Sequence, residues 1–345
     1  MISAPTHTSP GLWALAARRL RADKVAMAAL TVVLAFLLLI SCSACGWLAA
    51  DWEQEVGLSY APPGFIGADA EETGASAPTI APAAASSIED NDIIDPLAVE
   101  LREIRAKLAQ AGKATVLERA ATLPFGADRW GHDILKKTIK GAETSIVVGL
   151  VAAFLATLLG TVFGALAGYF GGRIDDFFNW FYSIFTAIPY LLLILSVAAV
   201  LQQKGVGTIV LILALTGWTG PFRLMRAEYM KHKNREYIWA ADAIGASHWR
   251  KMAWQIFPNV SHVALVQVSI LVVGFIKSEV ILSFLGFGVP VGTVSWGSML
   301  NEAQNELILG KWWQLTAATV AMAVLVTAFS LFTDALRDAL DPKLK

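Results

Sequence analysis

The sequence Trp-Ala-Ala-Asp-Ala-Ile-Gly-Ala-Ser occupies residues 239–247, and Gln-Ile-Phe-Pro closes the same segment at residues 255–258. This polar, basic segment lies between two long apolar runs, residues 205–222 and 262–285. A short basic segment between apolar runs is typical of a loop that joins two membrane-spanning helices. The segment therefore predicts a polytopic membrane protein with a docking surface on one side of the bilayer.

The composition agrees with a chain that lies mostly in a bilayer. Of 345 residues, 56% are hydrophobic and 16% are charged, and the mean hydropathy is +0.56. Soluble domains have about 45–50% apolar and about 25% charged residues. A helix needs about 20 apolar residues to cross about 30 Å of hydrocarbon. Six runs reach that length: residues 25–47, 146–170, 177–202, 205–222, 262–285 and 313–335. We expect an all-α fold with six transmembrane helices.

The orientation follows from Lys and Arg in the short loops, because the net charge of −1 carries no such information. The N-terminal stretch, the 223–259 loop and the C-terminal tail are rich in Lys and Arg. The two short connectors on the other side have one each, Lys204 and Lys311. Both termini and the 223–259 loop are therefore predicted to be cytoplasmic.

The chain is divided as follows: a cytoplasmic N-terminus (1–24), a first transmembrane helix (25–47), an outer insertion (48–145), a five-helix core (146–335) with the cytoplasmic loop 223–259, and a cytoplasmic tail (336–345). Within the insertion, residues 61–90 are rich in Ala, Pro, Ser and acidic residues, which predicts a flexible spacer. Residues 95–111 have apolar residues at helical spacing and predict an amphipathic helix. The insertion touches a binding protein, covers the pore or has no direct role; these alternatives stay open.

Two cysteines, Cys42 and Cys45, lie near the end of the first apolar run. They form no metal-binding pattern with other residues, so we interpret them as small apolar residues of a helix. An alternative is a lipoprotein signal cleaved before Cys42, although the apolar run is longer than the usual core of such a signal.

Every fourth residue of the second run is small: Ala152, Ala156, Gly160, Gly164, Gly168 and Gly172. Such a face lets a neighbouring helix backbone approach closely, which favours packing in lipid. We therefore predict helix packing at Gly160, Gly164 and Gly168. Pro189 and Pro221 predict a helix kink and a helix end.

Lys277 and Glu279 are ionisable residues within the fifth apolar run. Each charge costs about 2.5–3.5 kcal/mol near the centre of a membrane helix and usually faces a cavity or a partner. Residues two apart point about 200° from one another on a helix, so the two do not pair. We expect Glu279 and Lys277 to lie on the translocation path. The alternatives are a side chain that snorkels to the membrane interface or one that makes a structural hydrogen bond.

The cytoplasmic loop predicts two helices joined by a turn. Residues 236–243 favour a helix that begins at Glu236 and includes Ala240 and Ala241. Gly245 ends this helix, Ser247 caps the second one, and Pro258 stops further winding. The two alanines are expected to leave a shallow surface for a partner.

This loop resembles that of the permease subunits of ATP-binding-cassette importers, whose pattern is Glu-Ala-Ala, three residues, Gly, nine residues and Ile-x-Leu-Pro. Ala240, Ala241, Gly245 and Pro258 fit that pattern in register. Trp239 stands where the family usually has Glu, and Glu236, one turn upstream, is a substitute for it. Gln255 and Phe257 replace the family's Ile and Leu.

The chain is most similar to the second permease of dipeptide and oligopeptide importers, over about residues 123–343. The matching patterns are Gly-Ala-Asp-Arg-Trp-Gly-His-Asp at 126–133, Gly-Tyr-Phe-Gly-Gly-Arg-Ile-Asp at 168–175, Ser-Phe-Leu-Gly-Phe-Gly at 283–288, Ser-Trp-Gly at 295–297 and Asp-Ala-Leu-Arg-Asp-Ala-Leu-Asp-Pro at 334–342. His132 and Glu143 stand where the family commonly has Arg, and the outer insertion is longer than usual.

The resemblance implies the fold of type I importer permeases and a partnership with a homologous permease, two ATPases and a peptide-binding protein that is periplasmic or lipid-anchored. The coupling loop inserts into the ATPases, which bind and hydrolyse ATP. The chain itself is then expected to bind no cofactor, metal or nucleic acid and to have no catalytic residue. It contains no phosphate-binding loop and no hydrolase motif.

Three other functions remain open at this point. Related permeases import nickel, opines or peptide antibiotics, and apolar spans do not distinguish their substrates. A secondary transporter that couples protons through Glu279 needs an ion site within its own chain. A surface adhesion or signalling protein needs only one span, which six apolar runs disfavour.

Overall fold

The computed structural model describes residues 12–67, 119–290 and 292–340. Contacts divide the chain into two units, which are described separately. The first unit comprises Met1–Ala50 and Lys137–Lys345, and the second comprises Asp51–Lys136. The predicted amphipathic helix at 95–111 and most of the predicted spacer at 61–90 lie outside the described residues.

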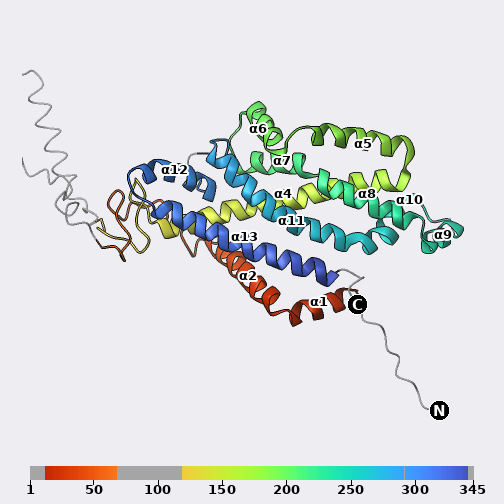
Figure 1. Cartoon of the computed structure of the whole chain (residues 1–345), viewed down its shortest axis with the longest axis horizontal. Coiled ribbons are helices and arrows are strands. Elements are labelled where there is room, and N and C mark those ends of the chain that lie inside the picture. Colours follow the sequence, from red (N-terminus) through yellow and green to blue (C-terminus); the bar gives the residue numbers. More distant parts are fainter. Residues whose placement is uncertain (1–11, 68–118, 291, 341–345) are drawn as a thin grey trace, which may run out of the picture. The chain divides into compact units, whose positions relative to one another are not determined.

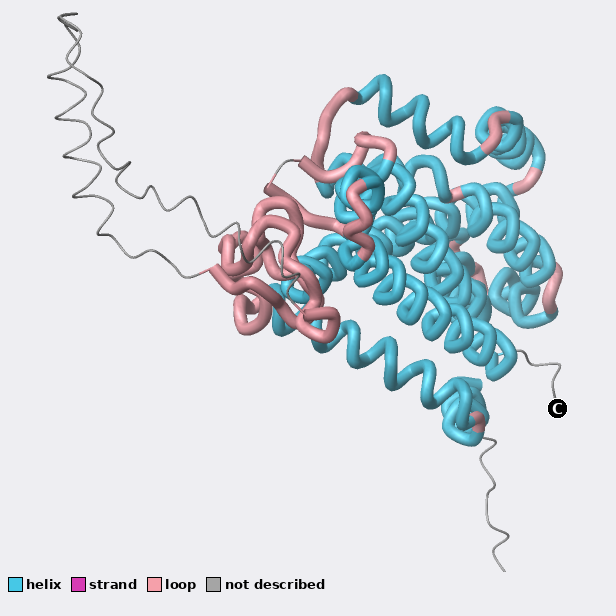
Figure 2. The backbone as a smooth tube through the Cα atoms, turned by 60° about the vertical axis from the view of Figure 1, so that its left-hand side comes forward, coloured by secondary structure: helices cyan, strands magenta, loops and turns pink. Residues whose placement is uncertain are grey.

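The described residues are organised into helices without a β-strand (Figures 1 and 2). The helices are α1 (Leu12–Ala22), α2 (Lys24–Ala44), α4 (Ile134–Phe170), α5 (Gly172–Ala187), α6 (Tyr190–Leu201), α7 (Val206–Gly217), α8 (Thr219–Lys233), α9 (Glu236–Ala243), α10 (His248–Arg250), a π-helix (Lys251–Ile256), α11 (Phe257–Phe284), α12 (Trp296–Ile308) and α13 (Trp313–Leu340). The all-α prediction is confirmed.

Among the described residues, four helices are long and apolar enough to cross a membrane, and six spans result if each of two bent helix pairs counts as one. The helix α4 begins twelve residues before the apolar run predicted at 146, at Ile134. Two further helices, α1 and α12, have no counterpart among the predicted spans.

The two bent pairs occur at the prolines of the sequence. Helices α5 and α6 meet at 92°, and α7 and α8 meet at 42°. Ile188, which precedes Pro189, is extended, with φ −100° and ψ 132°, as the proline ring requires. Pro221 does not end a helix, contrary to the prediction, because it lies in the first turn of α8, where no backbone N–H is needed.

Helix α4 contacts the backbone of α8 through its glycines. A Cβ atom at Gly160, Gly164 or Gly168 would lie 2.6, 2.7 or 2.4 Å from the carbonyl oxygen of Trp218, Phe222 or Arg226. These distances leave no room for a side chain. The fourfold spacing of the glycines thus fixes how closely the two helices approach.

Helix α5 packs against the start of α8 through aromatic rings and one ion pair. Phe181 stacks on Trp218 with ring centroids 5.3 Å apart and planes at 17°. Arg226 donates two hydrogen bonds to Asp175, with Nη2 and Oδ2 2.6 Å apart. The bidentate geometry gives this pair a defined orientation.

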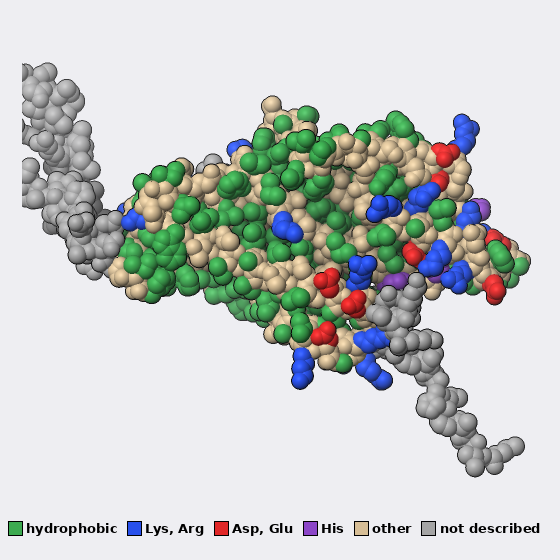
Figure 3. Space-filling model, viewed as in Figure 1, with side chains coloured by type: hydrophobic (Ala, Val, Ile, Leu, Met, Phe, Trp, Pro, Cys, Tyr) green, Lys and Arg blue, Asp and Glu red, His purple; other side chains and the backbone are tan. Residues whose placement is uncertain are grey.

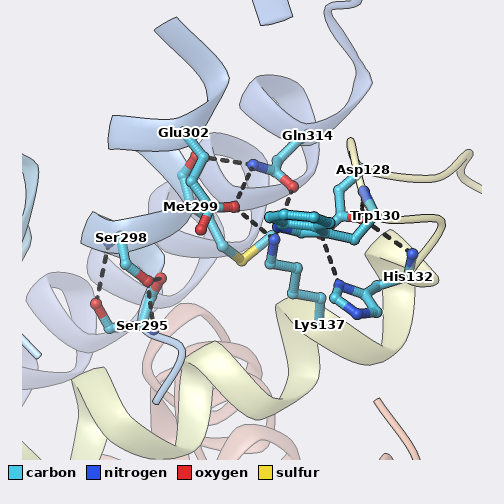
Figure 4. Close-up of polar contacts among 9 residues, drawn as sticks. All are labelled: Asp128, Trp130, His132, Lys137, Ser295, Ser298, Met299, Glu302 and Gln314. Carbon is cyan, nitrogen blue, oxygen red and sulfur yellow. Dashed lines mark hydrogen bonds and ion pairs between the residues drawn. The ribbon is translucent and has the colours of Figure 1, made fainter. Parts of the chain in front are cut away.

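The described part of the second unit consists of loops and turns with isolated bridges, such as those between Gly57 and Ala120 and between Pro63 and Leu123. Asp128 is completely buried and holds one of these turns (Figure 4). Its carboxylate accepts hydrogen bonds from the backbone N–H groups of Trp130 and His132, at 2.8 and 3.0 Å. His132, which replaces the expected Arg, also contacts Asp128 through Nδ1 at 3.0 Å.

We expect Gly168→Leu to lower the thermal unfolding midpoint of the detergent-solubilised protein by several degrees, because its side chain would push α8 away from α4. The matched control is Gly207→Ala in the first turn of α7, where a Cβ would meet nothing within 4 Å. Unfolding is followed by circular dichroism. An unchanged midpoint for Gly168→Leu would contradict the close approach of the two helices.

Candidate functional site

The candidate site is the segment from α9 to the start of α11, which joins two membrane-spanning elements. It comprises α9, a turn at residues 244–247, α10 and the π-helix. Figure 3 shows Lys, Arg, Asp and Glu side chains gathered at the end of the first unit that carries α9 and α10.

Gly245 makes the turn between the two helices of this segment. Its φ of +74° is left-handed, which L side chains rarely adopt. The N–H of Gly245 donates to the carbonyl of Asp242, and the N–H of Ala246 donates to that of Ala241, both at 3.0 Å. This pair of bonds is the glycine-dependent helix end of a Schellman motif.

Ser247 begins the second helix, and its hydroxyl accepts a hydrogen bond from the N–H of Arg250 at 3.4 Å. The expectation that Pro258 stops the helix is wrong. The proline lies in the first turn of α11, and the helix continues from His248 to Phe284. Pro258 supplies no N–H to the preceding turn, which widens to a π-helix there. Asn259 Nδ2 donates to the carbonyl of Gln255 at 2.6 Å and satisfies an acceptor near the proline.

One face of the segment is buried against the transmembrane helices. Ile238 of α9 and Met252 and Ile256 of the π-helix belong to one apolar cluster with Tyr169 and Tyr229. The Tyr229 hydroxyl donates to the carbonyl of Met252 at 3.2 Å. The segment is therefore fixed to α4 and α8 rather than free to move by itself.

Polar contacts strengthen this attachment. Lys251 is buried and forms an ion pair with Asp242 of α9. Its ammonium also lies 5.9 Å from the centroid of the Tyr169 ring. The Tyr169 hydroxyl is 2.9 Å from His248 Nδ1. A buried ammonium needs such partners, since an unpaired charge in this position is costly.

The opposite face exposes large apolar side chains. Trp239, Ile244, Trp249 and Trp254 have exposed fractions of 61%, 82%, 66% and 79%. A hollow lies among Trp249, Arg250, Ala253 and Trp254. Clustered exposed tryptophans next to an Arg are typical of a protein-binding surface. We call Trp239, Ile244, Trp249 and Trp254 the tryptophan surface.

The residues predicted for the loop take different positions. Glu236, Ala240, Gly245, Ser247 and Pro258 are exposed. Ala241 is buried with 3% exposure and faces the apolar cluster, so the expected shallow surface of two alanines is wrong for this residue.

Next to Glu236, Tyr237 of α9 lies with its hydroxyl 2.8 Å from His232 Nδ1. Partial burial raises the pKa of the Tyr237 phenol above its usual value.

Glu279 and Lys277 point to different surroundings, as the 200° separation predicts. Glu279 is completely buried and accepts hydrogen bonds from Ser145 at 2.6 Å and from Ser283 at 2.7 Å. The Ser145 hydroxyl in turn accepts from the N–H of Trp296 at 3.2 Å. Glu279 thus joins α4, α11 and the start of α12. Lys277 is exposed on α11.

A second polar group lies near the other end of the helices (Figure 4). Lys137 of α4 is buried, and its ammonium contacts Glu302 of α12 at 2.6 Å and Gln314 of α13 at 3.3 Å. Gln314 Nε2 also donates to the carbonyl of Met299 at 3.1 Å. Nearby on α4, Glu143, which replaces the expected Arg, accepts from Ser43 of α2 at 2.8 Å. These contacts connect helices and create no open site.

Within residues 12–67, 119–290 and 292–340, no group of three or more His, Cys, Asp or Glu residues is arranged to hold a metal ion. Cys42 and Cys45 are free thiols at the end of α2.

The tryptophan surface was missed by the sequence reasoning, which considered the alanines and the basic residues of the loop. A signal was present, because four large apolar residues occur within sixteen residues of an otherwise polar loop. Their exposure could not be read from the sequence, because it depends on which side chains of the segment pack into the apolar cluster.

Comparison with known proteins gives two family matches. Residues 160–345 match the family described as binding-protein-dependent transport system inner membrane component. Residues 11–63 match the N-terminal transmembrane domain of oligopeptide transport permease C.

Individual relatives agree with these matches. The dipeptide transport system permease protein DppC of Bacillus subtilis is 37% identical over 221 residues, which cover 64% of this chain and 69% of the relative. The oligopeptide transport system permease protein OppC of the same organism is 36% identical, with 64% and 72% covered. The dipeptide transport system permease protein DppC of Escherichia coli K12 is 40% identical, with 64% and 73% covered.

Asp242→Asn should loosen the junction between α9 and the π-helix, because it removes the negative charge that faces the buried Lys251 ammonium. The Asp242 side chain is half exposed, so solvent screens part of this interaction. We expect faster amide hydrogen exchange in residues 236–256 of the solubilised protein, with Glu236→Gln on the exposed side of α9 as the control. Equal exchange in both variants would show that Asp242 does not hold the segment.

Proposed function

Because this chain belongs to the family of binding-protein-dependent transport system inner membrane components, we propose that it is the permease subunit that couples ATP hydrolysis to peptide import. It is a multi-pass membrane protein of the peptide importer type, as its helices and its relatives indicate. The relatives are dipeptide and oligopeptide permeases, which favours peptides over nickel, opines or peptide antibiotics as the cargo.

The tryptophan surface is the observation that carries the coupling proposal. It consists of large apolar side chains that are exposed on the polar loop between α8 and α11. A partner that buries these side chains gains the hydrophobic contribution of several aromatic rings. We infer that an ATPase subunit binds here, because the loop that carries the surface is the one whose pattern resembles the coupling loop of importer permeases.

The attachment of the segment supports a mechanical role. A movement of a bound ATPase would push on α9 and the second helix, which are fixed to α4 and α8 by the apolar cluster and by the Lys251–Asp242 pair. The second helix is continuous with α11 from His248 to Phe284. The push therefore reaches the membrane interior without a flexible joint, and alternating access follows from rotation of the spans. The chain performs no chemistry, and ATP is bound and hydrolysed by the partners.

The full assembly in this proposal contains a homologous permease as a heterodimeric partner, two ATPases and a peptide-binding protein that is periplasmic or lipid-anchored. Its location is the bacterial inner membrane, with both termini and the tryptophan surface in the cytoplasm. Glu279 is engaged by Ser145 and Ser283, which favours a structural role for it over proton coupling.

The tagged chain, purified from its native membranes in mild detergent, should recover a second permease and ATPase chains, and the eluate should hydrolyse ATP. Trp239→Ala and Trp249→Ala should reduce the ATPase recovered by about tenfold while the second permease is retained, since exposed tryptophans are often dominant contacts. Trp180→Ala, an equally exposed tryptophan of α5, is the control. A lone chain without ATPase activity would refute the assignment.

Gly245→Val should abolish most peptide uptake at normal membrane levels, because a β-branched residue does not tolerate a φ of +74° and the two loop helices would lose their relative direction. Gly245→Asn should retain most uptake, since Asn adopts the left-handed region more readily. Uptake of a radiolabelled peptide into cells measures both variants. Full uptake with Gly245→Val would mean that this turn is not part of the coupling device.

A further inference from the structure

Lys277 is an exposed cation on α11, a helix that is otherwise largely apolar. It lies seven residues before Phe284, the last residue of the helix, which corresponds to about 10 Å along the axis. An ammonium at such a depth is costly in lipid, so it normally faces water or an anion.

Residues 12–67, 119–290 and 292–340 supply no counter-charge for Lys277. Glu279, two residues further on, is turned into the protein and is used by Ser145 and Ser283. Within the described ranges, Lys277 forms no ion pair with a carboxylate and no side-chain hydrogen bond. A counter-anion for Lys277 is therefore to be sought outside the described residues.

The surface beside Lys277 has room for a ligand. Gly274 lies one turn earlier on the same side of α11, and a Cβ atom there would meet nothing within 4 Å. Ile270 and Ile281, above and below, are also exposed.

A line of polar side chains runs next to this face. Gln267, Gly274 and Ser278 are seven and four residues apart and so lie along one side of α11. The Tyr190 hydroxyl of α6 interacts with the hydroxyls of Ser278 and of Thr216 on α7. Gln267 and Ser278 are buried, so the side of α11 next to Lys277 faces protein rather than lipid.

We propose that Lys277 binds the C-terminal carboxylate of the peptide while it passes through the permease, a proposal that rests on the proposed function. A peptide with a free C-terminus supplies the missing negative charge, and the gap at Gly274 admits a main chain beside the ammonium. Lysine suits this task, because it is a flexible point charge, whereas the planar arginine fork favours long-lived bidentate pairing. Transit requires contacts that release the ligand again.

The test uses the complete assembly in proteoliposomes, with binding protein and ATP. The probes are one oligopeptide with a free C-terminal carboxylate and the same oligopeptide as its amide, chosen so that the binding protein accepts both. Import is compared for the wild type, Lys277→Gln and Lys277→Arg. Lys204→Gln, an exposed lysine in the connector between α6 and α7, is the control.

We expect Lys277→Gln to lower import of the free acid by about tenfold, the factor that one charge-assisted contact supplies, and to change import of the amide by less than twofold. Lys277→Arg keeps the positive charge and should preserve the preference for the free acid over the amide, and Lys204→Gln should behave as the wild type. If Lys277→Gln lowered import of both peptides equally and less second permease were recovered with the chain, the proposal would be overturned. The carboxylate that pairs with Lys277 would then belong to the partner subunit. Unchanged import of both peptides would overturn it as well. If the wild-type assembly imports neither peptide but is assembled and hydrolyses ATP, the proposed function fails instead.

Discussion

The close contact between the glycines of α4 and the backbone of α8 is the constraint on which the first unit depends. Lipid offers no hydrophobic gain for bringing two helices together, so the contact must come from van der Waals packing at short range. Any side chain at Gly164 or Gly168 would collide with carbonyl oxygens of α8. With α8 fixed in this way, Trp218 and Phe222 receive the aromatic rings of α5, and Tyr229 receives the π-helix.

Polar side chains inside the first unit serve two different purposes. Glu279 and Lys137 are buried and have their partners on other helices, so they join α4 to α11, α12 and α13. Such groups specify which helices pack together, because every alternative arrangement leaves a buried charge unpaired. Lys277 differs from them because it is exposed. The free-energy cost of an unpaired charge in a membrane helix then favours an external partner, either a ligand or a second subunit.

Much of the fold follows from patterns that are local in the sequence. Apolar run lengths give the spans, and the four-residue spacing of small residues identifies the face of α4 that contacts α8. The Gly245 turn and the Ser247 cap follow from their backbone requirements. The prolines were harder to interpret, because Pro258 and Pro221 each occupy a first helical turn, where they continue a helix. Sequence alone does not tell a proline that ends a helix from one that begins the next.

The site was predicted less completely than the fold, since exposure is decided by contacts far apart in the chain. Ala241 and Ala240 are adjacent and chemically identical, yet Ala241 is buried and Ala240 is exposed. The tryptophans of the loop are exposed because Ile238, Met252 and Ile256 are the residues of this segment that pack into the apolar cluster. No local sequence pattern tells which of these apolar residues is buried. Their packing partners Tyr169 and Tyr229 come from two other helices.

The unbroken helix from His248 to Phe284 has a geometric consequence. Its 37 residues extend over about 55 Å, longer than the hydrocarbon layer is thick. Such a rod acts as a lever: a tilt of about 10° displaces one end by about 10 Å relative to the other. If the helix turns as a rigid rod, a small rotation at the end that carries Trp249 and Trp254 becomes a displacement of about 10 Å at Phe284.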